Sequence, residues 1–180
     1  MKELEILGED RFPAFTNPRS GSRAVIVQNG KLLVVHESRT GWWQLPRGGT
    51  ESGETPEECC IRETEEETGL IIKPVCRFLT LVEYYAEYRN ITCFFTAEVT
   101  GREQMRLTDT EARRGAEPVW LPVRDALVLF ARHPPARKQT KKNAVPAYGI
   151  IPLCGKLFPA VSPRGSADRL SLPRARRHAR

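Results

Sequence analysis

A run of glycines, glutamates and one arginine at fixed separations constrains this chain more than any other feature. Residues 48–70 read GGTESGETPEECCIRETEEETGL. The positions that recur in the argument are a glycine at 48, a glutamate at 54, Arg-Glu at 62–63, Glu-Glu at 66–67 and a glycine at 69. At a chance frequency of about one in ten per position, a full match arises roughly once in 100,000 chains of this length. The spacing of these seven residues is therefore a specific signal.

The second half of the run predicts a helix over about residues 56–68. Thr55 is a good N-cap, Pro56 suits the first helical position, and Glu58 completes a Thr-x-x-Glu capping box. Gly69 suits the C-terminal end of the helix. The residues before Thr55 are rich in glycine and turn formers, so we expect a loop that leads into this helix.

Three carboxylates share one face of the expected helix, because Glu63, Glu66 and Glu67 are spaced i, i+3 and i+4. Such a cluster repels itself, whereas a hard divalent cation that prefers oxygen ligands would convert the repulsion into coordination. Magnesium is the natural partner, with manganese as an alternative. A solvated acidic face is the other reading of a glutamate-rich helix. That reading leaves the glycines and Arg62 at their fixed positions without a reason.

The run resembles the Nudix box, whose pattern is glycine, five residues, glutamate, seven residues, Arg-Glu, two residues, Glu-Glu, one residue and glycine. The one departure is Thr64 at a position that is apolar in the family, and its hydroxyl would need a hydrogen-bond partner. The resemblance covers about residues 22–132. It implies an α+β fold: a Nudix-type α/β/α sandwich with a mixed β-sheet, in which the box forms a loop, a helix and a second loop.

The resemblance also implies roles for the box residues. Metal ions would be held by one backbone carbonyl and three carboxylates, those of Gly48, Glu63, Glu66 and Glu67. Either Glu66 or Glu67 would position or deprotonate the attacking water. From spacing alone, Arg62 precedes Glu66 by four residues and can orient it by a charge-assisted hydrogen bond, while Glu54 in the loop can brace Arg62.

The activity that the resemblance implies is magnesium-dependent hydrolysis of the pyrophosphate bond in a nucleoside diphosphate linked to another group. Arg47, just before the box, favours dinucleoside polyphosphates or capped nucleotides, because a basic residue often stands there in family members that act on them. Nucleotide sugars, ADP-ribose and oxidised nucleoside triphosphates stay open. The alternative is a Nudix-fold nucleotide sensor or protein-interaction module without turnover, whose signature would be the loss of box carboxylates.

Residues outside the box have weaker claims. Arg23 in an expected strand and Arg47 are candidates to bind phosphate, and Trp43 is a candidate to stack on a base, although a place in the core is the simpler interpretation of this tryptophan. Many family members take a further metal ligand from outside the box. Glu111 and Glu117 are the two candidates here, and the sequence does not choose between them.

Patterns along the rest of the chain predict strands joined by tight turns. Apolar and β-branched runs predict strands over residues 22–28, 31–36, 42–45, 79–88, 91–99 and 119–123, and a short helix over residues 125–132. Asn29-Gly30 is a strong hairpin turn. Arg89-Asn90 is interpreted as a second one.

Charge and proline content divide the chain into three segments: an irregular N-terminal segment (1–21), a catalytic domain (22–132) and a basic proline-rich tail (133–180). The tail carries 11 Lys and Arg and one acidic residue, so the net charge of +6 is concentrated there and the rest of the chain is acidic. We expect the tail to be disordered or loosely attached, with contact to nucleic acid as the less favoured alternative.

The remaining composition favours a cytoplasmic protein, and the resemblance implies that its partner is a nucleotide-derived small-molecule substrate. No apolar run reaches the roughly 20 residues that span a bilayer, and the acidic N-terminus does not resemble a secretory signal. The five cysteines have no CxxC spacing, which argues against both a disulfide framework and a zinc site. The oligomeric state has no sequence signature.

Overall fold

The computed structural model describes residues 1–8 and 11–132, which form strands and three helices. In chain order these elements are β1 (Lys2–Leu7), β2 (Asn17–Val25), β3 (Val27–Gln28), β4 (Lys31–Glu37), β5 (Trp42–Gln44), β6 (Arg47–Gly49), α1 (Pro56–Thr68), β7 (Leu70–Tyr85), β8 (Tyr88–Arg102), α2 (Asp109–Arg114), β9 (Ala116–Pro122) and α3 (Val123–Arg132). Among these residues no helix is both long and apolar enough to cross a membrane.

The larger of two sheets is mixed and has the strand order β1-β7-β8-β2-β6. β1 runs parallel to β7 and β2 runs parallel to β8, while the β7–β8 and β2–β6 pairs are antiparallel. The smaller sheet is antiparallel and built on β4, with β9 along one edge and the short strands β3 and β5 along the other. The chain crosses from one sheet to the other between β2 and β3.

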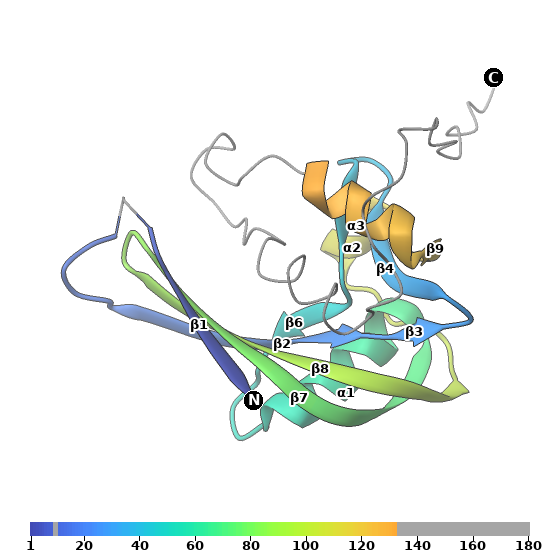
Figure 1. Ribbon diagram of the computed structural model, residues 1–180, viewed down its shortest axis with the longest axis horizontal. Coiled ribbons are helices and arrows are strands. Elements are labelled where there is room, and N and C mark those ends of the chain that lie inside the picture. The colour runs from blue at the N-terminus through green and yellow to red at the C-terminus, as the bar shows by residue number, and fades with distance from the viewer. Residues whose placement is uncertain (9–10, 133–180) are drawn as a thin grey trace.

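The larger sheet has a helix on each of its faces (Figure 1). On one face a core cluster joins Ala24, Cys93 and Phe95 of the sheet to Cys60 of α1. On the other face a second cluster joins sheet residues to the apolar side of α3 and to the smaller sheet; its buried members include Val25, Leu79, Leu81, Phe94, Val123, Ala126 and Phe130. Burial of the two faces gives the α/β/α sandwich, and the expected α+β class is confirmed.

Elements with strong local signals lie where the sequence predicts them. The box helix α1 spans Pro56–Thr68, with the Thr55–Glu58 capping box at its start and Gly69 in the left-handed conformation at its end. The Asn29-Gly30 turn connects β3 to β4, and both residues have positive φ, as a tight hairpin turn requires.

Two expectations about strands are wrong. Residues 1–21 were expected to be irregular, but Lys2–Leu7 forms β1 and β2 begins at Asn17. β1 is held by its hydrogen-bond ladder to β7 and leaves most of its side chains exposed, so its sequence carries no burial pattern. The second hairpin turns at Ala86 and Glu87, since Arg89 and Asn90 are already paired with β7.

Two short elements have no counterpart among the expected ones, and one expected hairpin is longer in the structure. The start of the box loop pairs with β2 as strand β6, because Gly48 faces Ser22 across the ladder. The helix α2 begins at a second capping box, made by Thr108 and Glu111. β7 and β8 are also longer than expected and form one hairpin from Leu70 to Arg102, which projects beyond the helices in Figure 1.

Candidate active site

The box carboxylates lie where α1 faces strand β6. The capping box of Thr55 and Glu58 fixes the start of α1: Glu58 donates its backbone N–H to the Thr55 hydroxyl at 3.2 Å and its carboxylate accepts the Thr55 N–H at 2.8 Å. Position 64 is the departure from the family pattern. Thr64 is buried, and its hydroxyl donates to the Cys60 carbonyl one turn back at 2.7 Å. The buried hydroxyl therefore has the partner it needs.

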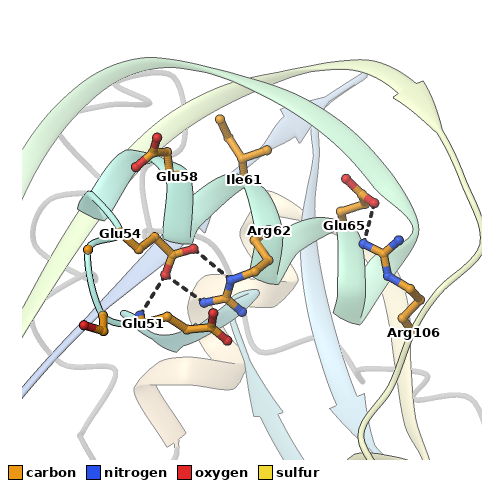
Figure 2. Close-up of a pocket in the computed structure, with 9 residues that line it drawn as sticks. Glu51, Glu54, Glu58, Ile61, Arg62, Glu65 and Arg106 are labelled. Carbon is orange, nitrogen blue, oxygen red and sulfur yellow. Dashed lines mark hydrogen bonds and ion pairs between the residues drawn. The ribbon is translucent and has the colours of Figure 1, made fainter.

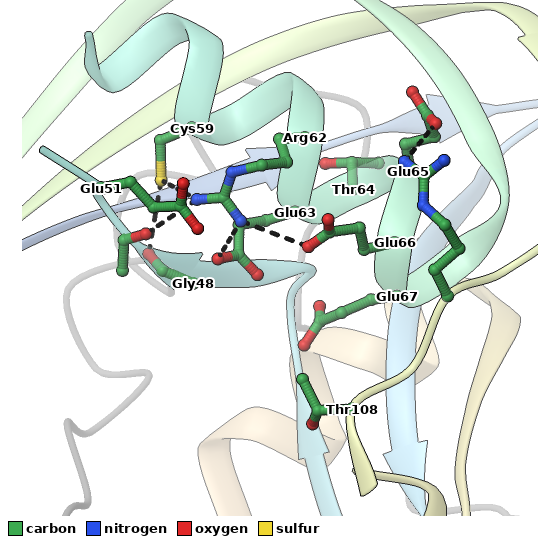
Figure 3. Close-up of polar contacts among 12 residues, drawn as sticks. Gly48, Glu51, Cys59, Arg62, Glu63, Thr64, Glu65, Glu66, Glu67 and Thr108 are labelled. Carbon is green, nitrogen blue, oxygen red and sulfur yellow. Dashed lines mark hydrogen bonds and ion pairs between the residues drawn. The ribbon is translucent and has the colours of Figure 1, made fainter. Parts of the chain in front are cut away.

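Arg62 is the hub of the polar network in Figure 3. Its guanidinium donates to both carboxylate oxygens of Glu54, at 2.8 and 2.9 Å, and to the Gly49 carbonyl at 2.9 Å. It also donates to Glu63 at 2.8 Å and to Glu66 at 3.2 Å. The pKa of Glu54 is held below its usual range mainly by its bond to Arg62. One arginine thus ties the loop before the helix to two box carboxylates.

Gly48 lies directly against the carboxylate of Glu63. A Cβ built on Gly48 would be 1.8 Å from the Glu63 carboxyl carbon and 2.0 Å from each of its oxygens. No other residue type leaves the carboxylate in that place, which gives the first glycine of the box a steric reason. The loop backbone and this carboxylate are therefore brought together by packing.

Glu67 is buried on the side of α1 that faces Arg47. Its side chain is 3% exposed, and one carboxylate oxygen accepts the backbone N–H of Arg47 at 2.9 Å. Desolvation raises the pKa of Glu67 to about 8, and it also raises the pKa of Glu63. Two poorly solvated carboxylates on one helix favour a nearby cation, which would stabilise their charged forms.

The donor set fits a hard divalent cation by its chemistry, because carboxylate and carbonyl oxygens are the ligands that such ions prefer. Within residues 1–8 and 11–132, however, no three acidic, histidine or cysteine side chains are already arranged around one point. Arg62 lies between Glu63 and Glu66 and bonds to both. Each carboxylate bonds Arg62 through one oxygen, Oε1 of Glu63 and Oε2 of Glu66, so its other oxygen can bind a cation while Arg62 holds the side chain.

The three candidates for substrate contact lie in two different places. Arg23 is buried on β2 and pairs across the ladder with Arg47 of β6, next to Glu67. The Arg47 side chain donates to Gln44 at 2.7 Å. Trp43, in contrast, belongs to the smaller sheet, where its ring stacks on His36 with centroids 3.9 Å apart and packs against the core cluster.

The two candidates for an extra metal ligand are separated by the fold. Glu111 completes the α2 capping box, and its charge acts on both Glu63 and Glu67. Figure 3 shows the N-cap of α2, Thr108, on the Glu67 side of α1. Glu117 lies on β9, exposed, 3.4 Å from His36. The geometry thus favours Glu111 over Glu117.

A shallow cavity of about 520 Å³ lies on the outer side of α1 (Figure 2). Several of its charged side chains are paired with one another: Glu54 binds Arg62, and Glu65 accepts from Arg106 at 2.7 Å. It is therefore lined by groups that hold the box loop and the helix in place.

Sequence reasoning missed Glu83, a buried carboxylate on β7. The sequence does contain a signal for it: Leu79, Leu81 and Glu83 are spaced two apart, so they lie on the same face of a strand. A charged residue at an inward position is unusual enough to mark a functional candidate.

Comparison with known proteins identifies the family. A family model described as the NUDIX domain matches residues 18–144, more than half of the chain. The chain belongs to the NUDIX domain family. Members of this family generally use divalent metal ions and act on nucleotide-derived small molecules.

Individual relatives match over shorter stretches. A protein named RNA pyrophosphohydrolase from Baumannia cicadellinicola subsp. Homalodisca coagulata is 43% identical over 61 residues, which are 34% of this chain and 38% of that protein. A putative ADP-ribose pyrophosphatase of Bacillus subtilis (strain 168) is 30% identical over 78 residues, 41% of this chain and 36% of that protein. The matched stretch is thus little more than a third of each relative.

The fold is shared with a solved NUDIX hydrolase from Nitrosomonas europaea. That structure superposes with a TM-score of 0.56 at 24% identity and covers 80% of this chain and 90% of its own. At this identity the likeness establishes the fold.

Proposed function

We propose that this protein is a magnesium-dependent hydrolase of phosphoanhydride bonds in a nucleoside diphosphate linked to another group. The observation that carries the proposal is the contact between strand β6 and helix α1. Gly48 is packed against the carboxylate of Glu63, and the backbone of Arg47 donates to the carboxylate of Glu67. These two contacts bring the carboxylates of Glu63 and Glu67 to strand β6, where Arg47 pairs across the ladder with Arg23.

In this proposal the cation is held by the box donors, Gly48, Glu63, Glu66 and Glu67, with Glu111 as the candidate from outside the box. When bound, Mg²⁺ neutralises negative charge on the phosphates and lowers the pKa of water, and Mn²⁺ can substitute for it. Glu54 holds Arg62, and Arg62 keeps Glu66 in place by hydrogen bonds. Glu66 or Glu67 accepts a proton from the attacking water. Burial raises the pKa of Glu67 to about 8, which supports Glu67 as a candidate base.

Dinucleoside polyphosphates or capped nucleotides are the substrate class that we favour. Arg47 lies immediately before the box and Arg23 faces it across the β2–β6 ladder, so two positive charges stand beside the carboxylates. Several linked phosphates would match this concentration of charge. The relative named RNA pyrophosphohydrolase supports this preference, and the putative ADP-ribose pyrophosphatase keeps ADP-ribose among the compounds to test.

The test is turnover of a panel of nucleotides by the purified protein with Mg²⁺, with products identified by mass spectrometry. Glu67→Gln removes the buried carboxylate at nearly constant volume, and Glu57→Gln changes an exposed glutamate of the same helix as the matched control. We expect the wild type and Glu57→Gln to release a nucleoside monophosphate product. Glu67→Gln should be slower by about 100-fold or more.

The second candidate is a nucleotide sensor that binds without turnover. Retention of all box carboxylates argues against it. Binding of a nucleotide together with an absence of turnover across the whole panel would favour the sensor over the hydrolase.

We also propose that residues 22–132 form the catalytic domain, within the match to residues 18–144, and that the protein acts in the cytoplasm. The free thiols of Cys59, Cys60, Cys76 and Cys93 support a reducing compartment.

The expected tail, residues 133–180, lies outside the described residues, and so does any contact of that tail with nucleic acid.

A further inference from the structure

Two buried charged side chains on the larger sheet have no hydrogen-bond or ion-pair partner among the described residues, although the Arg23 guanidinium lies over the Phe94 ring, 5.9 Å from its centre. Arg23 of β2 is 8% exposed and Glu83 of β7 is 4% exposed. Within residues 1–8 and 11–132, neither forms a hydrogen bond or an ion pair, and Oε2 of Glu83 is a buried oxygen without a partner. A buried unpaired carboxylate is costly, and two such groups that served only the fold would be expected to pair with each other.

Both side chains project from the same face of the sheet. In register, Arg23 is opposite Phe94 of β8, and Phe94 is opposite Leu79 of β7. Since side chains alternate along a strand, Glu83 shares the face of Leu79. This face carries the core cluster under α3, and beyond Leu79 it continues along the projecting β7–β8 hairpin (Figure 1). Glu83 thus lies on this face four residues beyond Leu79.

Arg23 stands between the box and Glu83. The pKa of Arg23 is lowered to about 9, mainly by burial and then by the nearby charge of Arg47, whereas Glu83 and Glu67 act in the opposite direction. Arg23 is therefore close enough to interact electrostatically both with Glu67 of the box and with Glu83. A ligand that extends from Glu83 to the box would pass Arg23 on the way.

Aromatic rings continue the same face past Glu83. Tyr85, two residues along β7, is stacked with Tyr88 of β8 at a centroid distance of 5.2 Å, and the Arg19 guanidinium lies 4.8 Å from the centre of the Tyr88 ring. Tyr85 is half-buried and close enough to Glu83 for their charges to interact. A planar group that binds Glu83 would lie beside this stack, where aromatic rings favour flat ligands.

We propose that Glu83 selects the base of the nucleotide: its carboxylate accepts hydrogen bonds from the adjacent N1–H and N2–H donors of guanine, while Arg23 contacts the phosphates. The proposal rests on the proposed function, because it takes the box as the place where the phosphates lie. Guanine is the base that presents two neighbouring donors on one edge, which matches the two oxygens of a carboxylate. Adenine and cytosine place an acceptor beside the donor, which a carboxylate repels.

The experiment is calorimetric titration of the full chain with GDP, IDP, ADP and 2′-deoxy-GDP in EDTA, so that turnover does not contribute. IDP lacks the N2 amino group and ADP lacks both donors. We expect wild-type protein to bind GDP at least about 10-fold more tightly than ADP, with IDP between them and 2′-deoxy-GDP close to GDP. Glu83→Gln should lower the ratio of GDP to ADP affinity by about 10-fold or more.

Two further variants separate base selection from general effects. Glu98→Gln changes an exposed glutamate on β8 and should leave every affinity unchanged. Arg23→Gln should weaken GDP and ADP alike and keep their ratio, as expected of a phosphate contact. An unchanged ratio of GDP to ADP affinity in Glu83→Gln would overturn the proposal. Wild-type protein that binds 2′-deoxy-GDP as weakly as ADP would overturn it too, since the ribose would then be a main contact of the carboxylate.

Turnover of the wild type, measured on the same preparation, separates this proposal from the proposed function. Hydrolysis with equal affinity for all bases would leave the enzyme assignment intact and remove the role of Glu83. Guanine selectivity that depends on Glu83 without hydrolysis would support the binding site and favour the sensor.

Discussion

Gly48 and Glu63 are packed so closely that a single methyl group at position 48 would occupy the place of the Glu63 carboxylate. The contact joins the strand before the box to the helix within it. Because the obstructed atoms are the far end of a flexible side chain, the carboxylate can swing away at little cost to the fold. Position 48 therefore affects the site far more than the stability of the protein.

Gly48→Ala tests this relationship. We expect metal-dependent turnover to fall by about 10-fold or more, with a change in the free energy of unfolding below about 1 kcal/mol. Gly49→Ala is the matched control, since a Cβ there meets its nearest atom at 3.9 Å. Chemical denaturation and initial rates measure the two effects. A large loss of stability with normal turnover in Gly48→Ala would show that the contact serves the fold.

Arg62→Lys tests the hub of the polar network. Lysine keeps the charge but cannot bond both oxygens of Glu54 while also reaching Glu63 and Glu66. We expect the Mg²⁺ concentration for half-maximal activity to rise by about 10-fold to 100-fold. Arg106→Lys, at an exposed arginine paired with Glu65, should leave it unchanged. Equal effects of the two substitutions would contradict the special position of Arg62.

Thr64 gives a prediction about stability alone. Its hydroxyl is bonded within the helix, so Thr64→Val should change the free energy of unfolding by less than about 1 kcal/mol. Thr64→Ser keeps the hydroxyl but removes a buried methyl group, and it should cost about 1 kcal/mol. Denaturant titration measures both variants. A Thr64→Val protein that is much less stable than Thr64→Ser would contradict the prediction and show that the hydroxyl bond stabilises the fold strongly.

Glu83 gives a prediction about pH. Burial raises the pKa of Glu83 to about 7, from 4.5. A carboxyl group whose pKa is raised by folding binds its proton more tightly in the folded state. Its stabilisation of the fold is complete at a pH below the pKa of the unfolded state and is lost as the pH rises through the pKa of the folded state. Between pH 5 and 8 the wild type should therefore lose on the order of 2–3 kcal/mol that Glu83→Gln does not lose.

The measurement is denaturant unfolding of both proteins at pH 5 and pH 8. Glu67 also has a raised pKa, but it is present in both proteins and cancels in the comparison. A stability difference between wild type and Glu83→Gln that is the same at the two pH values would contradict the raised pKa of Glu83.

Features set by neighbours in sequence were predictable, and features set by strand pairing were not. Thr55 and Glu58 cap α1 through bonds three residues apart, so their signal is complete in the sequence. Lys2–Leu7 becomes a strand only because β7 lies beside it. The second hairpin turns at Ala86, a residue type without a turn preference, because pairing along β7 and β8 decides the register.

The site divides in the same way. The contacts of Arg62 with Glu54 and Glu66 follow from spacing on a helix and its preceding loop. The choice between Glu111 and Glu117 needed the path of the chain after β8. Arg23 and Glu83 are 60 positions apart in the sequence, and only the pairing of β2, β8 and β7 places them on one face of the larger sheet.

Binding of Mn²⁺, followed by electron paramagnetic resonance, tests the central claim most directly: that the box carboxylates hold a divalent cation. Wild-type protein and Glu57→Gln should bind the ion with the same affinity. Replacement of Glu63 or Glu67 by glutamine should weaken binding by about 10-fold or more, because each removes a charged oxygen ligand. Equal Mn²⁺ affinity in all four proteins would contradict the account.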